Sequence, residues 1–326
     1  MPATELLTLD SKYAWKAGTV YMTGVQALVR LPLEQAAADR RAGMKTGGLV
    51  TGYQGSPLAG FDLELGRNAE RLREAGIRHQ PALNEELAAT AVMGSQLVSQ
   101  LPDARHEGVV GYWYGKAPGL DRAGDAIRHA NLIGVEPEGG AIAIVGDDAM
   151  SKSSTVPSSS ESALFDFLVP FLSPADPQEV LDLGLHAVAL SRASGLWAGL
   201  KIATNVADGS GSVELGADRI DPWMPTVELD GKPYRHQPTS RLVGPVMLEL
   251  ERSQHAARLE AARLYGVGNH LNRTEYAGDD DRIGIVAAGK TYLDLLQALA
   301  AYGLTGAELE RSPLRLLKVA MPFPLD

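Results

Sequence analysis

The chain has 326 residues, of which 45% are hydrophobic and 21% charged, with a formal net charge of −10 and no cysteine. The negative charge argues against a nucleic-acid partner, because such proteins offer a basic surface to phosphate, and the lack of cysteine excludes disulfides, thiolate zinc sites and cysteine-held iron–sulfur clusters from the chain. No apolar run approaches the roughly 18 residues that a membrane helix needs, and no secretory signal is seen, so we expect a cytoplasmic protein with no membrane partner.

Helix and strand patterns alternate over the first two thirds of the chain. Apolar residues at helical spacing predict a helix from Thr23 to about Gly43. The run Ala141–Val145 is continuously apolar, as in a parallel strand covered on both faces. Further strands are predicted at 47–53, 108–113 and 196–204, and further helices at 59–75, 85–96, 121–133 and 177–194. This alternation predicts an α/β fold with a mainly parallel sheet flanked by helices over residues 1–210.

The pattern changes after residue 210. Residues 211–280 read as an excursion or linker that contains a long helix, from about Gly244 to Tyr265. Residues 281–326 then offer a strand, a helix and a strand, which predict the start of a second α/β domain. One such unit cannot cover both faces of its own sheet, so we expect this second domain to be incomplete. The chain would then be a subunit, a truncation or a fragment of a longer polypeptide.

Three polar or glycine-rich loops follow predicted strands, at residues 53–58, 114–119 and 147–160. Ligands of open parallel sheets bind beyond the carboxyl ends of the strands, so these loops predict a shared site. No dinucleotide or P-loop signature accompanies them, and the seven histidines show no ligand spacing. We therefore predict no metal site in this chain.

A pair of carboxylates opens the predicted helix after Asn84. Asn84 is a good N-cap residue, and Glu85 and Glu86 fall in the first turn, where the helix dipole favours negative charge. Ordinary capping explains both residues, and nothing in the helical spacing separates one from the other.

Five short motifs occur in one order along the chain: Thr23–Arg30, Gly52–Pro57, Leu83–Ala88, Val145–Asp148 with the serine-rich loop behind it, and Ser173–Glu179. Together they resemble the pyrimidine-binding region of the 2-oxoacid:ferredoxin oxidoreductases, and most closely the indolepyruvate branch of that thiamine diphosphate-dependent family. Two positions depart from the family pattern: Gln54 stands in place of proline and Ser56 in place of threonine.

The resemblance implies roles for particular residues. Glu85 would be the catalytic group that hydrogen-bonds the N1′ atom of the cofactor's aminopyrimidine, while Glu86 occupies a variable place. Tyr53 and Gly55 would also contact the cofactor. Substrate contacts are implied for Ser56, Asp147, Asp148 and Ser153. The family's reaction is the oxidative decarboxylation of a 2-oxoacid, here indolepyruvate or another aryl pyruvate, to an acyl-CoA, with electrons passed to ferredoxin.

The missing parts of that machinery imply partners. The chain lacks the family's diphosphate-binding pattern and any cysteine for clusters, so we expect other domains or chains to supply Mg²⁺ and the iron–sulfur clusters, within an oligomer that uses CoA and a 2-oxoacid. Two alternatives stay open at this point. In the first alternative to the oxidoreductase interpretation, the chain is a non-catalytic remnant that serves as a scaffold or partner-binding domain. In the second, it is part of another kind of thiamine enzyme, such as a non-oxidative decarboxylase.

Overall fold

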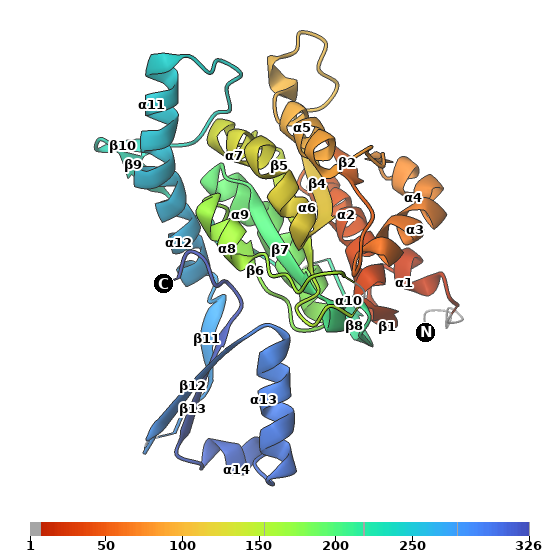
Figure 1. Ribbon diagram of the computed structural model, residues 1–326, viewed down its shortest axis with the longest axis vertical. Coiled ribbons are helices and arrows are strands. Elements are labelled where there is room, and N and C mark those ends of the chain that lie inside the picture. Colours follow the sequence, from red (N-terminus) through yellow and green to blue (C-terminus); the bar gives the residue numbers. More distant parts are fainter. Residues whose placement is uncertain (1–7, 153, 218, 279, 326) are drawn as a thin grey trace.

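The computed structural model describes residues 8–152, 154–217, 219–278 and 280–325. Its centre is a six-stranded sheet in the order β3-β2-β4-β5-β7-β6, with every neighbouring pair parallel (Figure 1). The strands are β2 Thr46–Gly52, β3 Ile77–His79, β4 Gly108–Lys116, β5 Gly140–Asp147, β6 Phe171–Leu172 and β7 Ala198–Ala203. The predicted α/β fold class, a mainly parallel sheet flanked by helices, is confirmed.

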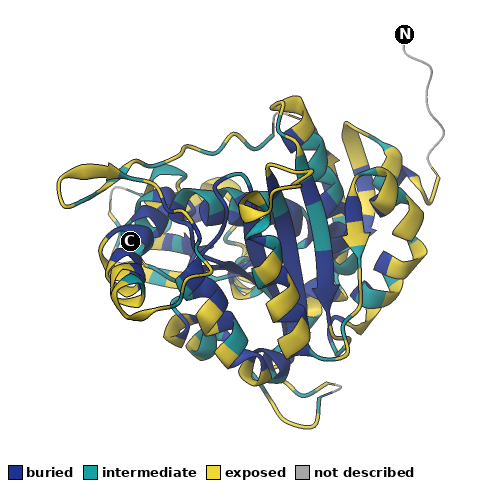
Figure 2. Cartoon of the chain, turned by 90° about the horizontal axis from the view of Figure 1, so that it is seen from above, coloured by how far each residue is buried: buried dark blue, intermediate teal, exposed yellow. Residues whose placement is uncertain are grey.

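Helices cover both faces of this sheet. One face carries α2 Gly24–Arg41, α3 Ala59–Arg67, α4 Ala69–Glu74 and α9 Pro177–Ser194. The other carries α5 Glu85–Ser95, α6 Ala117–Arg122, α7 Gly124–Ile133 and α8 Glu161–Asp166. Seen from above, the buried strands lie between helices whose outer surfaces are exposed (Figure 2). Within the described residues, no helix combines the length and apolar character needed to cross a bilayer.

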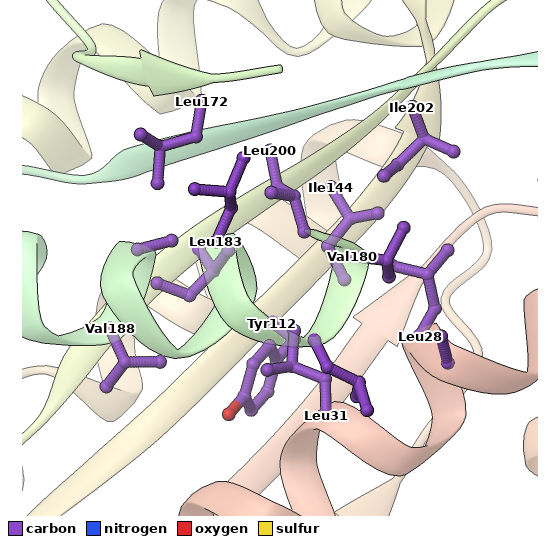
Figure 3. Close-up of a cluster of buried hydrophobic side chains, with 14 of the residues drawn as sticks. Leu28, Leu31, Tyr112, Ile144, Leu172, Val180, Leu183, Val188, Leu200 and Ile202 are labelled. Carbon is purple, nitrogen blue, oxygen red and sulfur yellow. The ribbon is translucent and has the colours of Figure 1, made fainter. Parts of the chain in front are cut away.

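Strand alternation divides the core into two apolar clusters. Ile142 and Ile144 of β5 belong to the cluster that includes α2 and α9, and Figure 3 shows Ile144 among leucines and valines of those helices. Ala141 and Ala143 point the other way, towards α5 and α7. Each fully buried large side chain contributes about 1.5–3 kcal/mol. Trp113 of β4 is fully buried in the second cluster, which also contains the apolar side of α5.

Two sequence predictions within this domain are wrong. The predicted loop 114–119 is the end of β4 followed by the start of α6, because Gly115 pairs with Val145 of β5 and Pro118 lies in the first turn of a helix, where its missing N–H costs little. The predicted helix 59–75 is divided at Asn68 into α3 and α4.

A two-stranded antiparallel ribbon lies beside the main sheet. It joins β1 Gly18–Thr23 to β8 Ser210–Leu215, with the short helices α1 Ser11–Ala14 and α10 Thr204–Ala207 nearby in the chain. The predicted boundary at residue 210 therefore falls at the start of a strand that belongs with the first domain. A 3-10 turn, Val98–Gln100, follows α5.

A helical arm runs along one side of the molecule (Figure 1). The hairpin β9 Val227–Leu229 and β10 Lys232–Tyr234 leads to α11 Gly244–Ser253, a π-helical turn Gln254–Arg258 and α12 Leu259–Gly268. The predicted long helix is thus present and carries a π-turn. Arg258, fully buried in that turn, donates hydrogen bonds to the carbonyl oxygens of Asn131 (2.6 Å), Leu132 (3.0 Å) and Gly195 (2.8 Å). A buried cation therefore satisfies the last carbonyls of α7 and anchors the arm.

The second α/β unit is a three-stranded mixed sheet in the order β11-β13-β12. Its elements are β11 Asn272–Tyr276, β12 Ile283–Ala288, α13 Lys290–Ala301, α14 Gly306–Glu310 and β13 Leu314–Val319. Because β11 belongs to this sheet, the unit begins earlier than the predicted boundary at residue 281. Lys318 of β13 pairs with Glu179 of α9. Past β13 the chain returns to the main sheet, where the N–H of Phe171 donates to the carbonyl of Phe323 at 2.9 Å.

Candidate active site

The strand order reverses between β2 and β4. The chain leaves β2 to form β3 on one side and then returns to form β4 on the other, and open parallel sheets bind ligands beyond the carboxyl ends of the strands at such a reversal. The backbone N–H of Ala82 donates to the carbonyl of Gly52 at 2.9 Å, so the segment that leads into α5 lies against the end of β2. The start of α5 therefore lies at the place where such sheets bind ligands.

Glu85 is the first residue of α5. The side-chain oxygen of Asn84 accepts a hydrogen bond from the N–H of Leu87 at 2.8 Å, which fixes the start of the helix as the sequence predicts. Glu85 is only 6% exposed, whereas Glu86 is exposed. Tertiary structure thus separates two carboxylates that local sequence leaves equivalent.

The Glu85 side chain lies against two glycines at the end of β4 and the start of α6. A Cβ atom placed on Gly119 would lie 2.7 Å from both Cγ and Oε1 of Glu85, and one on Gly115 would lie 3.4 Å from Cγ. The indole N–H of Trp113 donates to the main-chain carbonyl of Glu85 at 2.8 Å. These contacts hold the residue at both its backbone and its carboxyl group.

One oxygen of the Glu85 carboxyl group has no hydrogen-bond partner among the residues that the structure describes. Oε2 is buried, and within the described part of the chain its nearest cation is Nη1 of Arg122, at 4.0 Å. A buried polar atom without a hydrogen bond costs about 1–3 kcal/mol, so such atoms in native proteins usually have a ligand or solvent role. This oxygen fits a ligand that offers a ring nitrogen or an N–H group.

The loop at residues 53–58 faces the same strand end. The N–H of Tyr53 donates to the carbonyl of Tyr114 at 3.1 Å, and a Cβ on Gly55 would lie 3.2 Å from Cδ of Lys116. Lys116 follows Gly115 directly, so consecutive residues of β4 touch the loop that carries Ser56 and the side chain of Glu85. The structure thereby brings four of the predicted site residues, Tyr53, Gly55, Ser56 and Glu85, around one strand end.

Four further residues at this strand end were not singled out from the sequence. Lys116 makes no ion pair within the residues that the structure describes, and Arg122 is 59% exposed, so both offer positive charge at this strand end. Trp113 and Gly119 shape the Glu85 slot. The stretch from 113 to 122 carries two aromatic residues, two glycines and two cations within ten residues, and this combination is the sequence signal that could have indicated them.

A polar network supports α3, the helix that follows the loop. The hydroxyl of Tyr114 donates to Asp62 of α3, and Nε2 of His79 lies 3.4 Å from that hydroxyl oxygen. Burial lowers the pKa of His79, against the opposing effect of Asp62. The network ties α3 to the ends of β3 and β4 and so fixes the far end of the loop.

Asp147 and Asp148 lie at the end of β5 and hold the 147–160 loop. Oδ2 of Asp147 accepts hydrogen bonds from the N–H (3.0 Å) and hydroxyl (3.1 Å) of Ser160. Asp148 accepts from the backbone N–H groups of Lys152 (2.8 Å) and Ser154 (3.0 Å). Both carboxylates are engaged in loop contacts, and their predicted contact with substrate stays a prediction. Ser153, predicted beside them, lies outside the described residues.

These two aspartates line a cavity of about 620 Å³ at the ends of β5 and β7. Its lining also includes Lys201 of β7. Lys290, at the start of α13 in the second unit, lines it as well. Glu85 and the 53–58 loop lie against the neighbouring strand end, where Pro57 contacts Gly146. The predicted site residues thus form two groups at the same edge of the sheet.

The pH dependence of stability should report the burial of Asp147. Burial raises the pKa of the Asp147 carboxyl to about 6, against the opposing effects of Ser160 and Lys201. Because the folded protein holds this proton more tightly than the unfolded chain, Asp147 stabilises most below pH 4 and loses that contribution as the pH rises through 6. As the pH rises from 4 to 7, we expect the unfolding free energy of Asp147→Asn to increase relative to that of the wild type by up to about 3 kcal/mol. Urea titrations at both pH values measure this, and a constant difference contradicts it.

Among the described residues, no cluster of three or more His, Asp or Glu side chains could hold a metal ion. The residues near the end of β4 offer the carboxyl group of Glu85, the hydroxyl of Ser56 and the cations Lys116 and Arg122. Such a set can bind an anionic substrate and exchange a proton with a bound ring.

Comparisons with known proteins bear on the fold and the family. Residues 273–326 match the family model described as the indolepyruvate oxidoreductase domain. The indolepyruvate oxidoreductase subunit IorA of Methanothermobacter thermautotrophicus is 27% identical over 315 residues, which are 97% of this chain and 45% of that protein. The same subunit of Pyrococcus abyssi is 24% identical over 314 residues, 94% of this chain and 42% of that protein. The chain thus spans less than half the length of the curated relatives it matches.

Two solved structures share the fold. A 2-oxoglutarate:ferredoxin oxidoreductase from Magnetococcus marinus, with 2-oxoglutarate, coenzyme A and succinyl-CoA bound, superposes with a TM-score of 0.67 at 12% identity, over 95% of this chain and 55% of that one. Transketolase from Campylobacter jejuni gives a TM-score of 0.51 at 10% identity, over 95% of this chain and 37% of that one. The resemblance drawn from the five sequence motifs is confirmed.

Proposed function

We propose that this chain forms the pyrimidine-binding part of a thiamine diphosphate-dependent 2-oxoacid:ferredoxin oxidoreductase that acts on indolepyruvate or another aryl pyruvate. The observation that carries the proposal is the buried Glu85 carboxyl group at the strand-order reversal, with Oε2 lacking a hydrogen-bond partner among the described residues. Relatives named as indolepyruvate oxidoreductase subunits support the substrate class.

Glu85 would hold the aminopyrimidine ring of the cofactor by a hydrogen bond and exchange a proton with it. When bound, thiamine diphosphate supplies the electron sink for the cleavage that releases carbon dioxide from a 2-oxoacid. The burial of Glu85 keeps competing water away from its carboxyl group, and the slot beside Gly119 limits the directions in which that group can point. Tyr53 and Gly55, which follow β2 and lie against the end of β4, would also contact the cofactor.

The rest of the enzyme is proposed to come from elsewhere. Other domains or chains would hold Mg²⁺ and the cofactor's diphosphate and supply the iron–sulfur clusters that pass electrons to ferredoxin, while CoA accepts the acyl group. Three apolar or aromatic residues close to Glu85 in the chain or at the same strand end are exposed: Leu83 by 85%, Leu87 by 49% and Tyr53 by 41%. An apolar rim of this kind suits contact with another protein surface. The cytoplasmic location and the oligomeric assembly expected from the sequence stay predictions.

The experiment that tests this function is a thiamine diphosphate titration of the protein assembled with its partner chains in the presence of Mg²⁺. Calorimetry should show binding, and the assembled enzyme should reduce ferredoxin when given indolepyruvate and CoA. A non-catalytic remnant would show no binding that depends on Glu85. Carbon dioxide release without ferredoxin reduction would instead indicate a non-oxidative decarboxylase.

Ser56→Ala tests the loop hydroxyl. Ser56 is half-buried in the loop beside Lys116, where its hydroxyl can donate to a substrate carboxylate. Losing one hydrogen bond to a charged group costs about 1.5–3 kcal/mol, so we expect the Michaelis constant for the 2-oxoacid to rise at least about tenfold, with cofactor affinity retained. Steady-state kinetics with the 2-oxoacid varied, together with cofactor titration, measure the two effects. An unchanged Michaelis constant would remove the carboxylate role from Ser56.

A further inference from the structure

Gly119 occupies a position where any other residue would collide with the Glu85 carboxyl group. A Cβ at this position would lie 2.7 Å from Oε1 and 3.0 Å from Cδ of Glu85, inside the ordinary contact distance of about 3.4 Å. Gly119 lies inside α6, where alanine is otherwise favoured over glycine by roughly 1 kcal/mol. It is not among the glycines with positive φ, so its backbone conformation does not require glycine either.

Contacts on the opposite side complete the slot. The ring of Trp113 packs against Gly115, where a Cβ would lie 2.7 Å from the ring edge. The indole N–H of the same tryptophan holds the main-chain carbonyl of Glu85. The backbone of Glu85 is therefore fixed by β4. Its carboxyl group occupies space that a side chain at position 119 would fill.

We propose that Gly119 is a positioning residue for Glu85: by lacking a side chain it sets the place of the carboxyl group that binds the cofactor ring. This inference rests on the proposed function, and the role it gives Gly119 is exerted through Glu85. Trp113 holds the backbone end of Glu85, and Gly119 sets the carboxyl end.

Gly119→Ala separates a positioning role from a purely structural one. The atoms that the new methyl group meets are the end of a flexible side chain, which can rotate away, so the fold should accept the change without loss of thermal stability. The carboxyl oxygen, however, must move from 2.7 Å to about 3.4 Å from the methyl carbon. A misplacement approaching 1 Å at a reacting group can cost about 100-fold in rate.

The test uses the full chain assembled with its partner chains and Mg²⁺. For Gly119→Ala we expect the dissociation constant of thiamine diphosphate to rise about tenfold and kcat to fall about 100-fold, with the unfolding midpoint unchanged or raised. Gly94→Ala is the matched control. Gly94 is an exposed helical glycine of α5, and a Cβ there meets no atom within 4 Å, so cofactor affinity and kcat should stay at wild-type values.

A double-mutant cycle shows whether the effect passes through Glu85. In a Glu85→Ala background there is no carboxyl group to displace, so adding Gly119→Ala should change the cofactor dissociation constant by less than about twofold. Wild-type cofactor affinity for Gly119→Ala, or an equal tenfold loss in both backgrounds, overturns the positioning role. Wild-type cofactor affinity for Glu85→Ala itself overturns the proposed function, and this inference with it.

Discussion

Glu85→Gln is expected to lower the turnover of the assembled enzyme by about 10³-fold or more while the chain folds normally. Glutamine has nearly the size of glutamate and fits the slot between Gly115 and Gly119, so the packing of α5 should survive. What the change removes is the ability of the carboxyl group to exchange a proton with a bound ring. Ferredoxin reduction dependent on the 2-oxoacid measures turnover, and urea unfolding checks the fold.

Glu86→Gln is the matched control, because it makes the same change of charge one residue further along the same helix turn. Glu86 is exposed, and both substitutions weaken the interaction with the helix dipole by a similar amount, about 0.3–1 kcal/mol. Turnover close to wild type is expected for Glu86→Gln. If Glu85→Gln keeps wild-type turnover, or if both variants lose activity equally, the catalytic assignment of Glu85 fails.

Arg258→Met should be the most destabilising of the variants described here. The substitution keeps an unbranched side chain but leaves the carbonyls of Asn131 and Leu132 without their buried donor, at about 1–3 kcal/mol for each buried acceptor, while the Gly195 carbonyl keeps the N–H of Val135. Burial lowers the pKa of Arg258 to about 10, and removing that buried charge recovers part of the loss. We expect a net loss of about 3 kcal/mol or more in unfolding free energy, measured by urea titration.

Arg263→Met provides the comparison for Arg258. Arg263 lies on α12, is 40% exposed, and pairs with Glu260 one helical turn away. Exposed pairs of this kind contribute about 0–1 kcal/mol, so a small change is expected. Equal losses in the two variants would mean that the carbonyl contacts of Arg258 do not anchor the arm.

Elements with a strong local pattern could be predicted from the sequence. The helix Pro177–Ser194 begins at an aspartate cap with proline behind it, and its predicted bounds agree with the structure. The two strands predicted within residues 281–326 are present as Ile283–Ala288 and Leu314–Val319, which are short, largely apolar segments between turn residues. In these segments local preference and tertiary packing favour the same structure.

Elements that depend on distant partners were missed. β1 pairs with β8, about 190 residues later, and only alternate residues of β1 are buried, so its own sequence carries a weak signal. β3 has three residues and is fixed by its pairing with β2. Gly115 suggests flexibility and so predicts a loop at the end of β4, whereas parallel neighbours on both sides hold this segment extended.

The candidate site also has features that local sequence predicts and features that depend on distant contacts. The N-cap at Asn84 and the position of Glu85 in the first turn follow from local chemistry. The difference between Glu85 and Glu86 does not, because it arises from contacts with β4 and α6, which are distant in sequence from α5. The family resemblance named Glu85, and the buried slot supplies the physical reason for that choice.

The return of residues 320–323 to the main sheet bears on how the protein avoids self-association. β6 is the outermost strand on its side, and an uncovered outer strand offers free N–H and carbonyl groups to strands of other molecules. Phe323 and Ala320 accept hydrogen bonds from Phe171 and Ser173 and thereby occupy that edge. Pro322 and Pro324 have no N–H to donate, so the added segment is itself a poor template for further strands. The sheet is thus closed to growth on this side by a piece of its own chain.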